Sequence, residues 1–239
     1  KVGGTLVKHY RDLAFMGFAE VIMNLKTILN NIKICKTDIL AFQPDVIIFI
    51  DYPGFNLRIA KWTKVLGFKN HDYISPQIWA WKESRIKEIK RDIDKMYVIL
   101  PFEKTFYEDK HHFPVSFVGH PLIDAIQAHP VIDDATFRKE NQLNDLPIIA
   151  LLPGSRKQEI TKMLSVMLSV ADDFKRYQFV IAGAPSQEYS FYQQLITSDN
   201  VKFLSNKTYD LLQHATAALV TSGTATLETA LFKVPEVVC

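Results

Sequence analysis

The sequence has little cysteine, no long hydrophobic run and almost no charge imbalance. Its two cysteines, Cys35 and Cys239, lie far apart among 239 residues and suggest no disulfide framework, so we expect a reducing compartment. No apolar run has the length of a membrane span. The formal net charge is +2, from 28 basic and 26 acidic residues, so the composition gives no reason to expect a nucleic-acid partner.

Both ends of the sequence look cut. It opens at Lys1 without an initiator methionine, and the final "VPEVVC" has the pattern of a strand interior. We therefore expect a fragment, and the lack of a signal peptide is uninformative. The hydrophobic content of 48% is that of a globular protein with a core.

Short apolar runs alternate with helical patterns along most of the chain. This alternation predicts an α/β protein with two parallel-sheet, Rossmann-like domains, at 1–122 and 147–239, joined by a linker at 123–146. Helices are expected at 13–42, 56–67, 82–94, 134–143, 157–174, 188–196 and 225–232. Strands are expected at 46–50, 71–75, 95–100, 115–119, 148–152, 177–183, 216–222 and 235–239.

Ligands of parallel sheets bind beyond the carboxyl ends of the strands, so the loops after the strands are the candidate sites. In "LLPGSRKQEI", Gly154 allows a sharp turn, Ser155 can cap the helix that follows, and Arg156 adds a guanidinium at its positive end. Such a loop suits a phosphate or pyrophosphate. It lacks the Gly-Lys-Ser/Thr ending of a Walker loop, and an ordinary turn with a surface arginine remains the alternative.

A second loop, "VTSGTATLE", joins a strand to a helix with small residues and places Glu228 in the first turns of that helix. A nucleotide could lie against this backbone while the carboxylate accepts hydrogen bonds from ribose hydroxyls. The alternative is a capped helix whose threonines and glutamate satisfy its own free N–H groups.

The loop "YISPQIWAWKESR" carries Trp79 and Trp81 after a strand, where aromatic side chains can line a sugar or acyl site or pack between domains. His111 and His112 are adjacent and have no nearby acidic or cysteine partner in the sequence, which argues against a metal site. His120 ends a strand next to the linker, where holding its loop by a ring hydrogen bond is an alternative to lining a cleft.

Seven motifs together resemble the lipid-A-disaccharide synthase family: "AFMGFAEV", "IDYPGFN", "SPQIWAWKESR", "LPFE", "FVGHPL", "LLPGSR" and "SGTATLE". The resemblance implies a GT-B fold whose two domains, both incomplete here, face a cleft. It implies an inverting transferase that joins UDP-2,3-diacylglucosamine to 2,3-diacylglucosamine 1-phosphate through a β(1→6) bond. It also implies no catalytic metal or cofactor, and a cytoplasmic position on the inner-membrane surface of a Gram-negative bacterium.

The resemblance implies that Arg156 stabilises the departing UDP, and that a carboxylate acts as the general base, for which Asp51 is the candidate in this chain. The substrate-binding residues that it implies are Asn56, Ser75, Gln77, Trp79, His120, Gly154, Ser155, Glu159, Ser222, Gly223, Thr224, Thr226 and Glu228.

The loop after the first expected strand departs from the family pattern. The apolar run "VIIFI" predicts a strand buried on both faces that ends on Asp51. Many relatives carry a second aspartate, usually favoured as the base, where this chain has Gly54. Asp51 is the acid that remains in the loop, and a turn-forming role is its alternative. The Gly-rich loop that opens family members is also missing, so we expect the 239-residue chain alone to be poorly active.

Phe15, Met16 and Phe18 precede the apolar stripe of the first expected helix. These side chains could be buried against the sheet, and the alternative is contact with acyl chains or the bilayer surface. Two other function classes also fit the loops: another GT-B enzyme acting on a UDP-sugar, such as a UDP-GlcNAc transferase or 2-epimerase, and a sugar-nucleotide-binding module without catalysis.

Overall fold

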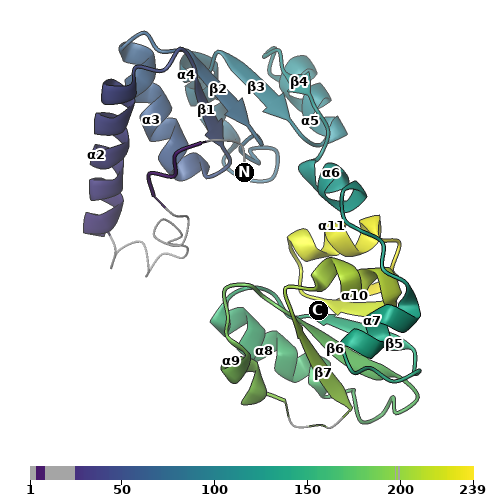
Figure 1. Cartoon of the computed structure of the whole chain (residues 1–239). Coiled ribbons are helices and arrows are strands. Elements are labelled where there is room, and N and C mark those ends of the chain that lie inside the picture. Colours follow the sequence, from purple (N-terminus) through teal and green to yellow (C-terminus); the bar gives the residue numbers. More distant parts are fainter. Residues whose placement is uncertain (1–3, 9–24, 197, 199) are drawn as a thin grey trace. The chain divides into compact units, whose positions relative to one another are not determined.

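A computed structural model of the chain describes residues 4–8, 25–196, 198 and 200–239. The chain divides into two compact units, Lys1–His120 and Pro121–Cys239, which are described separately (Figure 1). The division falls close to the expected end of the first domain at residue 122. Each unit contains a parallel sheet, so the expected α/β class is confirmed.

Unit 1 has a four-stranded sheet in the order β1-β2-β3-β4, and all of its strands are parallel. Its strands are β1 (Ile47–Ile50), β2 (Asn70–Tyr73), β3 (Lys95–Val98) and β4 (Ser116–Phe117). Its helices are α2 (Leu25–Phe42), α3 (Pro53–Val65), α4 (Ile86–Asp92) and α5 (Pro101–Thr105), with a short 3-10 helix at Glu83–Arg85 and a π-helical segment at Phe106–Lys110.

The expectation that the first strand is buried on both faces is wrong. β1 lies at the edge of the described sheet, and its Phe49 is buried while Ile48 and Ile50 are 56% and 57% exposed. Phe49 and the half-buried Ile47 share one face, which packs in a core with residues of α2 and α3. The uninterrupted apolar run reflects β-branched propensity as well as burial, and so it overstated the burial.

Unit 2 has a five-stranded parallel sheet in the order β7-β6-β5-β8-β9. Its strands are β5 (Ile148–Leu152), β6 (Gln178–Gly183), β7 (Val201–Ser205), β8 (Ala215–Val220) and β9 (Glu236–Val238). Its helices are α6 (Pro121–Gln127), α7 (Asp134–Glu140), α8 (Lys157–Leu168), α9 (Tyr189–Gln193), α10 (Thr208–His214) and α11 (Thr224–Leu231).

The segment expected as a linker, 123–146, is folded into unit 2. It includes α7, whose Phe137 is 1% exposed and packs in one core cluster with Ile148 and Leu211. Asp133 caps this helix, because its side chain accepts the Thr136 N–H at 3.0 Å. The helix expected at 134–143 is therefore present as α7, and its Phe137 side chain packs into the core of unit 2.

Strand β7 and helix α10 were not among the expected elements. β7 lies at the edge of the sheet, where it buries Val201 and Leu204 and exposes Lys202 and Ser205. The central strands β5 and β6 are almost entirely buried and produce the continuous apolar runs on which the strand prediction relied. A search for continuous apolar runs therefore finds central strands and misses a partly exposed edge strand.

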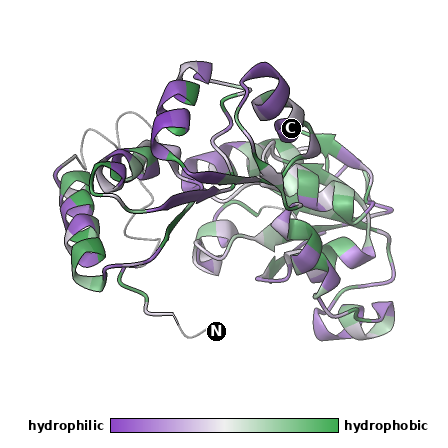
Figure 2. Cartoon of the chain, turned by 90° about the horizontal axis from the view of Figure 1, so that it is seen from above, coloured by the Kyte–Doolittle hydropathy of each residue, from purple (hydrophilic) through white to green (hydrophobic). Residues whose placement is uncertain are grey.

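Two helical layers cover the sheet of unit 2. Ile160, Leu164 and Met167 of α8 pack with Tyr192 of α9 against one face. Residues of α7, α10 and α11 pack against the other face (Figure 1). In Figure 2 the helices carry both hydrophilic and hydrophobic colours, as expected for helices that bury one side only.

The order of strands places a topological switch point in the middle of this sheet. From β5 the chain winds outwards through β6 and β7, and it then returns to add β8 and β9 on the other side of β5. The loops after β5 and β8 therefore leave the sheet in different directions and open a crevice at its carboxyl edge. A ligand site is therefore expected in that crevice.

Candidate functional site

A pocket of about 440 Å³ lies in unit 2 at the carboxyl edge of the sheet. It is lined by the loops that follow β5, β6 and β8 and by the first turns of α8, α10 and α11. The expected residues that line it are Gly154, Ser155, Arg156, Glu159, Ser222, Gly223, Thr224 and Glu228. The structure thus brings two separately predicted loops into one site at the switch point.

The loop after β5 turns tightly around the Glu159 side chain. Gly154 has φ +100°, and a Cβ built there would lie 2.2 Å from Glu159 Oε2. The same Oε2 accepts the Ser155 N–H at 3.0 Å, while Ser186 Oγ donates to the Ser155 carbonyl at 3.0 Å. Glu159 therefore shapes the loop from within, and Arg156 follows the loop as a pocket-lining cation just before α8.

The loop after β8 is open around its glycine. Gly223 has φ +154°, and a Cβ added there would meet nothing within 4 Å. The hydroxyl of Thr226 donates back to the Gly223 carbonyl at 2.7 Å, so this half-buried side chain stabilises its own turn and is not in the pocket lining. The small residues leave room for a ligand to lie against the backbone.

A tyrosine that the sequence analysis missed positions Glu228. The Tyr209 hydroxyl donates to Glu228 Oε1 at 2.9 Å. Burial, reinforced by the Glu228 carboxylate, raises the pKa of Tyr209 to about 12. The Tyr209 ring packs edge-on against His129 and tilted against Phe232, with centroid distances of 5.3 Å in both cases.

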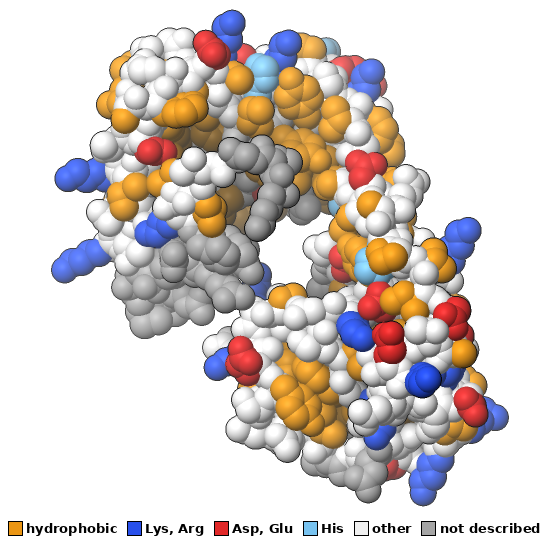
Figure 3. Space-filling view, viewed as in Figure 1, with side chains coloured by type: hydrophobic (Ala, Val, Ile, Leu, Met, Phe, Trp, Pro, Cys, Tyr) orange, Lys and Arg blue, Asp and Glu red, His pale blue; other side chains and the backbone are white. Residues whose placement is uncertain are grey.

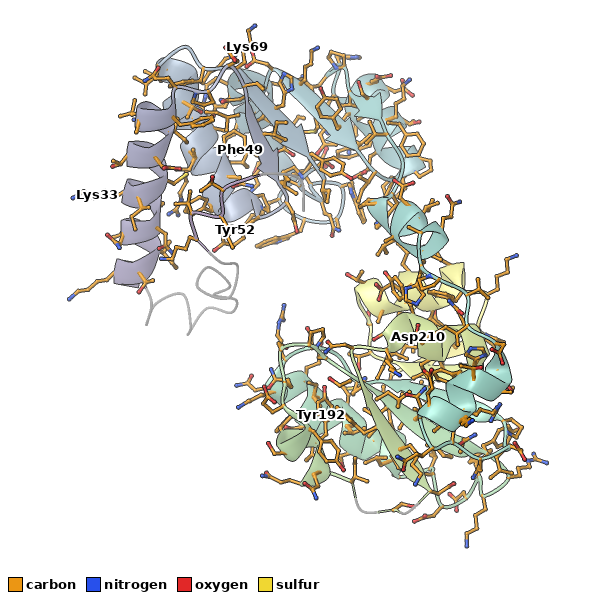
Figure 4. All side chains as sticks on the ribbon, in the orientation of Figure 1. Lys33, Phe49, Tyr52, Lys69, Tyr192 and Asp210 are labelled. Atoms are coloured by element: carbon orange, nitrogen blue, oxygen red, sulfur yellow. The ribbon has the colours of Figure 1, made fainter. Side chains whose placement is uncertain are left out.

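Neighbouring side chains brace the other walls of the pocket. His129 Nε2 lies 2.6 Å from Asp210 Oδ1, which comes from α10 (Figure 4). The buried Tyr192 of α9 accepts the N–H of the pocket-lining Ala184 at 2.9 Å. These contacts hold α6, α9 and the loop after β6 in place around the crevice.

In unit 1, the loop after β1 carries Asp51 in a constrained backbone. Asp51 and Tyr52 both have φ 48°, in the left-handed region that non-glycine residues rarely adopt. Asn56 donates its Nδ2 group to the backbone carbonyls of Ile50 and Asp51. Asn56 therefore closes the loop, and the Asp51 side chain is exposed at its start.

A second carboxyl group lies close to Asp51. Asp72 on β2 is 2% exposed, and its Oδ1 atom is buried without a hydrogen-bond partner. Burial and, to a lesser degree, the Asp51 charge raise the pKa of Asp72 to about 8. No motif marked this residue, because its neighbourhood depends on the pairing of β1 with β2.

Glu103 organises the tryptophan loop of unit 1. Its Oε1 accepts from Ser75 Oγ at 2.7 Å and from Trp79 Nε1 at 3.3 Å, and its Oε2 accepts the backbone N–H groups of Ile99 and Leu100. Ser75 is therefore buried in this network, and Trp79 is 37% exposed. The motif "LPFE" contains Glu103, but its contacts with the other motif required the fold.

The remaining expected residues belong to unit 1. Gln77 is exposed, and the half-buried His120 ends unit 1 after Gly119, which has φ +84°. His111 and Lys110 both contact Glu83, at 3.0 and 2.8 Å. Within residues 4–8, 25–196, 198 and 200–239, no group of three or more His, Cys, Asp or Glu side chains is placed to hold a metal ion.

Comparison with known proteins decides the family. A profile of the lipid-A-disaccharide synthetase family matches the chain over residues 1–239. The chain belongs to the lipid-A-disaccharide synthetase family. The expected resemblance is therefore confirmed, and it rests on the whole chain rather than on the short motifs.

Named members of the lipid-A-disaccharide synthetase family are similar over most of the chain. The lipid-A-disaccharide synthase of Syntrophus aciditrophicus is 41% identical over 234 residues, which are 95% of this chain and 61% of that protein. The synthase of Coxiella burnetii is 39% identical over 231 residues, with 95% and 60% covered. Lipid-A-disaccharide synthase 1 of Legionella pneumophila (strain Lens) is 40% identical over 240 residues, with 98% and 62% covered. The chain thus spans about three fifths of the length of these relatives.

Solved structures resemble the chain in fold. MnaA of S. aureus, in a co-structure with UDP, aligns with a TM-score of 0.65 and 12% identity over 89% of this chain and 63% of that one. A UDP-N-acetylglucosamine 2-epimerase aligns with a TM-score of 0.57 and 16% identity over 93% and 60%. At these identities the likeness shows the fold alone, and it agrees with the GT-B type that the family resemblance implies.

Phe15, Met16 and Phe18 lie outside the described residues. In the part of the chain that the structure describes, no helix combines the length and the apolar character needed to cross a bilayer. On the face shown in Figure 3, Lys and Arg side chains are interspersed with Asp and Glu.

Proposed function

We propose that the protein to which this chain belongs is an inverting glycosyltransferase of lipid A biosynthesis. It joins UDP-2,3-diacylglucosamine to 2,3-diacylglucosamine 1-phosphate and releases the β(1→6) disaccharide 1-phosphate and UDP. The observation that carries this proposal is the family match over residues 1–239. The chain spans about three fifths of its relatives, so the activity is assigned to the whole protein.

The pocket of unit 2 is proposed to bind the UDP moiety. Its walls carry Arg156, the backbone beside Ser155 and the Ser222–Thr224 loop, which together offer a cation and hydrogen-bond donors to a diphosphate. Glu228 is a carboxylate held by Tyr209, so its free oxygen can accept a hydrogen bond from a ribose hydroxyl. The phosphates would thus be bound by backbone N–H groups, hydroxyl groups and an arginine side chain.

The proposed chemistry is a single displacement at the anomeric carbon. The 6-hydroxyl oxygen of the acceptor forms the new bond from the face opposite UDP, while the bond from the anomeric carbon to the β-phosphate oxygen breaks. The hydroxyl proton passes to a carboxylate, for which Asp51 is the candidate. Arg156 stabilises the negative charge that develops on the departing UDP.

Association with the cytoplasmic surface of the inner membrane is part of the same proposal. Both sugars carry acyl chains, and Phe15, Met16 and Phe18 offer apolar side chains in one short segment. Replacement of Phe18 with glutamate in the whole protein should weaken binding to liposomes, as measured by co-sedimentation. Unchanged sedimentation would remove this segment from the proposal.

Calorimetric titration of the 239-residue chain with UDP in the presence of EDTA tests the pocket. Arg156→Ala should weaken UDP binding by about tenfold or more, because hydrogen bonds between charged groups are stronger than those between neutral groups. Arg176, an exposed arginine outside the pocket lining, provides the matched control. Equal affinities of the wild type and Arg156→Ala would exclude Arg156 from the site.

Transferase activity of the whole protein tests the chemistry. With EDTA present, the two diacylated sugars should yield disaccharide, and UDP-GlcNAc without acyl chains should not. Turnover of UDP-GlcNAc alone would favour another GT-B enzyme.

A binding module without catalysis is the second candidate, and the observation that favours it is Gly54, at the position where the family resemblance implies an aspartate in many members. Asp51→Asn separates the two candidates. Lost turnover with retained UDP binding identifies a base, and unchanged turnover excludes Asp51.

A further inference from the structure

Thr221 is a buried threonine whose hydroxyl has no partner. It directly follows β8, it is 9% exposed, and its Oγ1 atom is buried without a hydrogen bond. Its backbone N–H is satisfied, because it donates to the Leu152 carbonyl at 2.9 Å. An unpaired buried hydroxyl disfavours the folded state, so this group needs a reason to be where it is.

Two nearby threonines show the ordinary alternative. Thr226 Oγ1 donates to the Gly223 carbonyl at 2.7 Å, and Thr229 Oγ1 donates to the Ala225 carbonyl at 2.8 Å. Both belong to α11, where a hydroxyl can reach the backbone of the preceding turn. Thr221 lies at a strand end and has no such carbonyl within its own turn, so its partner must come from elsewhere.

The position of Thr221 indicates where that partner lies. Side chains alternate along β8: Ala218 and Val220 pack in the cluster with α10, whereas Leu219 packs in the cluster with α8. Thr221 continues the ladder and therefore falls on the Leu219 face, on the side of α8. It also lines the pocket, between the loop at Ser155 and the loop at Ser222.

We propose that Thr221 is a ligand-binding residue whose hydroxyl donates a hydrogen bond to a phosphate oxygen of the bound nucleoside diphosphate. This inference rests on the proposed function of the pocket. Phosphate oxygens only accept hydrogen bonds, and this side of the crevice holds Arg156 and the start of α8, where anions are favoured. The hydroxyl is then unpaired in the empty pocket and paired in the occupied one.

The assignment predicts opposite effects on stability and binding. Thr221→Val keeps the shape and removes the unpaired hydroxyl, so the thermal midpoint of the empty protein should stay the same or rise. The same variant should bind UDP about tenfold more weakly. Thr221→Ser keeps the hydroxyl and should bind UDP within about twofold of the wild type. Affinity for uridine, which has no phosphate, should not change in either variant.

Thr229→Val is the matched control. This buried threonine lies on α11 outside the pocket lining, and its hydroxyl is paired. The control should lower the thermal midpoint and leave the affinity for UDP unchanged, which is the reverse of the pattern for Thr221→Val. Calorimetric titrations with UDP and with uridine, and thermal unfolding without ligand, measure all four proteins.

Three results would overturn the assignment, and they are distinguishable. If the wild-type chain binds UDP and Thr221→Val binds it equally well, the hydroxyl has no role and the proposed function stands. A lowered thermal midpoint with unchanged UDP affinity would show a structural partner such as a buried water. If the wild type does not bind UDP at all, the proposed function and this assignment fail together.

Discussion

At Gly154 the backbone turns from β5 towards α8 with φ +100°, and the Glu159 carboxylate fills the space where a Cβ would lie, at 2.2 Å. Gly154→Ala should therefore lower the free energy of unfolding by about 1–3 kcal/mol, from backbone strain and displacement of Glu159. It should also weaken UDP binding, because displacement of Glu159 breaks its hydrogen bond with the Ser155 N–H and shifts the pocket-lining loop. Urea unfolding and calorimetric titration measure the two effects.

Gly54 offers a matched control for this prediction. It lies in the first turn of α3, and a Cβ there would meet nothing within 4 Å. Gly54→Ala should leave the free energy of unfolding unchanged or raise it by up to about 1 kcal/mol, because alanine restricts the unfolded chain. Equal losses in the two variants would contradict the role assigned to the Gly154 turn.

Asp72 should make the stability of the chain depend on pH. Burial, followed by the Asp51 charge, raises its pKa from 3.8 to about 8, so the folded state holds this proton while the unfolded state has lost it. Its contribution to the free energy of unfolding is fully present below about pH 4 and declines as pH rises towards 8. The slope is at most about 1.4 kcal/mol per pH unit.

Asp72→Asn removes this titration. The free energy of unfolding of the variant relative to the wild type should increase as pH rises from 5 to 8, whatever the offset at pH 5. Urea unfolding at several pH values measures that difference. Asp51→Asn removes the neighbouring charge and should lower the pKa of Asp72, so the stability should vary over a narrower pH range. A difference between Asp72→Asn and the wild type that does not vary with pH would refute the assignment.

At the scale of elements, a hydrogen bond joins α10 to α11 beside the pocket. Tyr209 of α10 donates to Glu228 of α11 at 2.9 Å, and its ring is held by His129 and Phe232. Tyr209→Phe keeps these ring contacts and removes the donor. We expect UDP affinity to fall by about three- to tenfold, because no hydroxyl then remains to orient the Glu228 carboxylate.

A double-mutant cycle with Glu228→Gln checks that prediction. If Tyr209 acts through Glu228, the losses of UDP affinity in the two single variants should not add in the double variant. Additive losses in calorimetric titrations would mean that Tyr209 contacts the ligand by itself or acts elsewhere. The ring contacts should keep the thermal midpoint of Tyr209→Phe close to that of the wild type.

At the scale of the whole molecule, each unit has a core of its own. Phe49, Met96 and their neighbours form the core of unit 1, and unit 2 has one core cluster on each face of its sheet. Because the pocket lies entirely in unit 2, UDP should slow hydrogen exchange mainly in the segments 152–160 and 220–228. Exchange mass spectrometry with and without UDP measures this, and equal protection of 46–56 in unit 1 would contradict it.

The sequence was a good guide to central elements and to loops. Strands β5 and β6 are buried on both faces, so their apolar runs stood out, and the loops after β5 and β8 could be named as sites because parallel strands bind ligands at their carboxyl ends. The edge strands were harder. β7 exposes Lys202 and Ser205 and was not predicted, whereas β1 was expected to be buried on both faces and exposes Ile48 and Ile50.

Local patterns thus determined the α/β class, the turn at 153–156 between β5 and α8, and the family likeness, because each depends on residues that are close together in the chain. The tertiary structure decided which side chains meet. Tyr209 reaches Glu228 from another helix, Asp72 approaches Asp51 through strand pairing, and Ser75 bonds to Glu103 across 28 positions of sequence. Such contacts follow from packing and strand register, which no single stretch of sequence encodes.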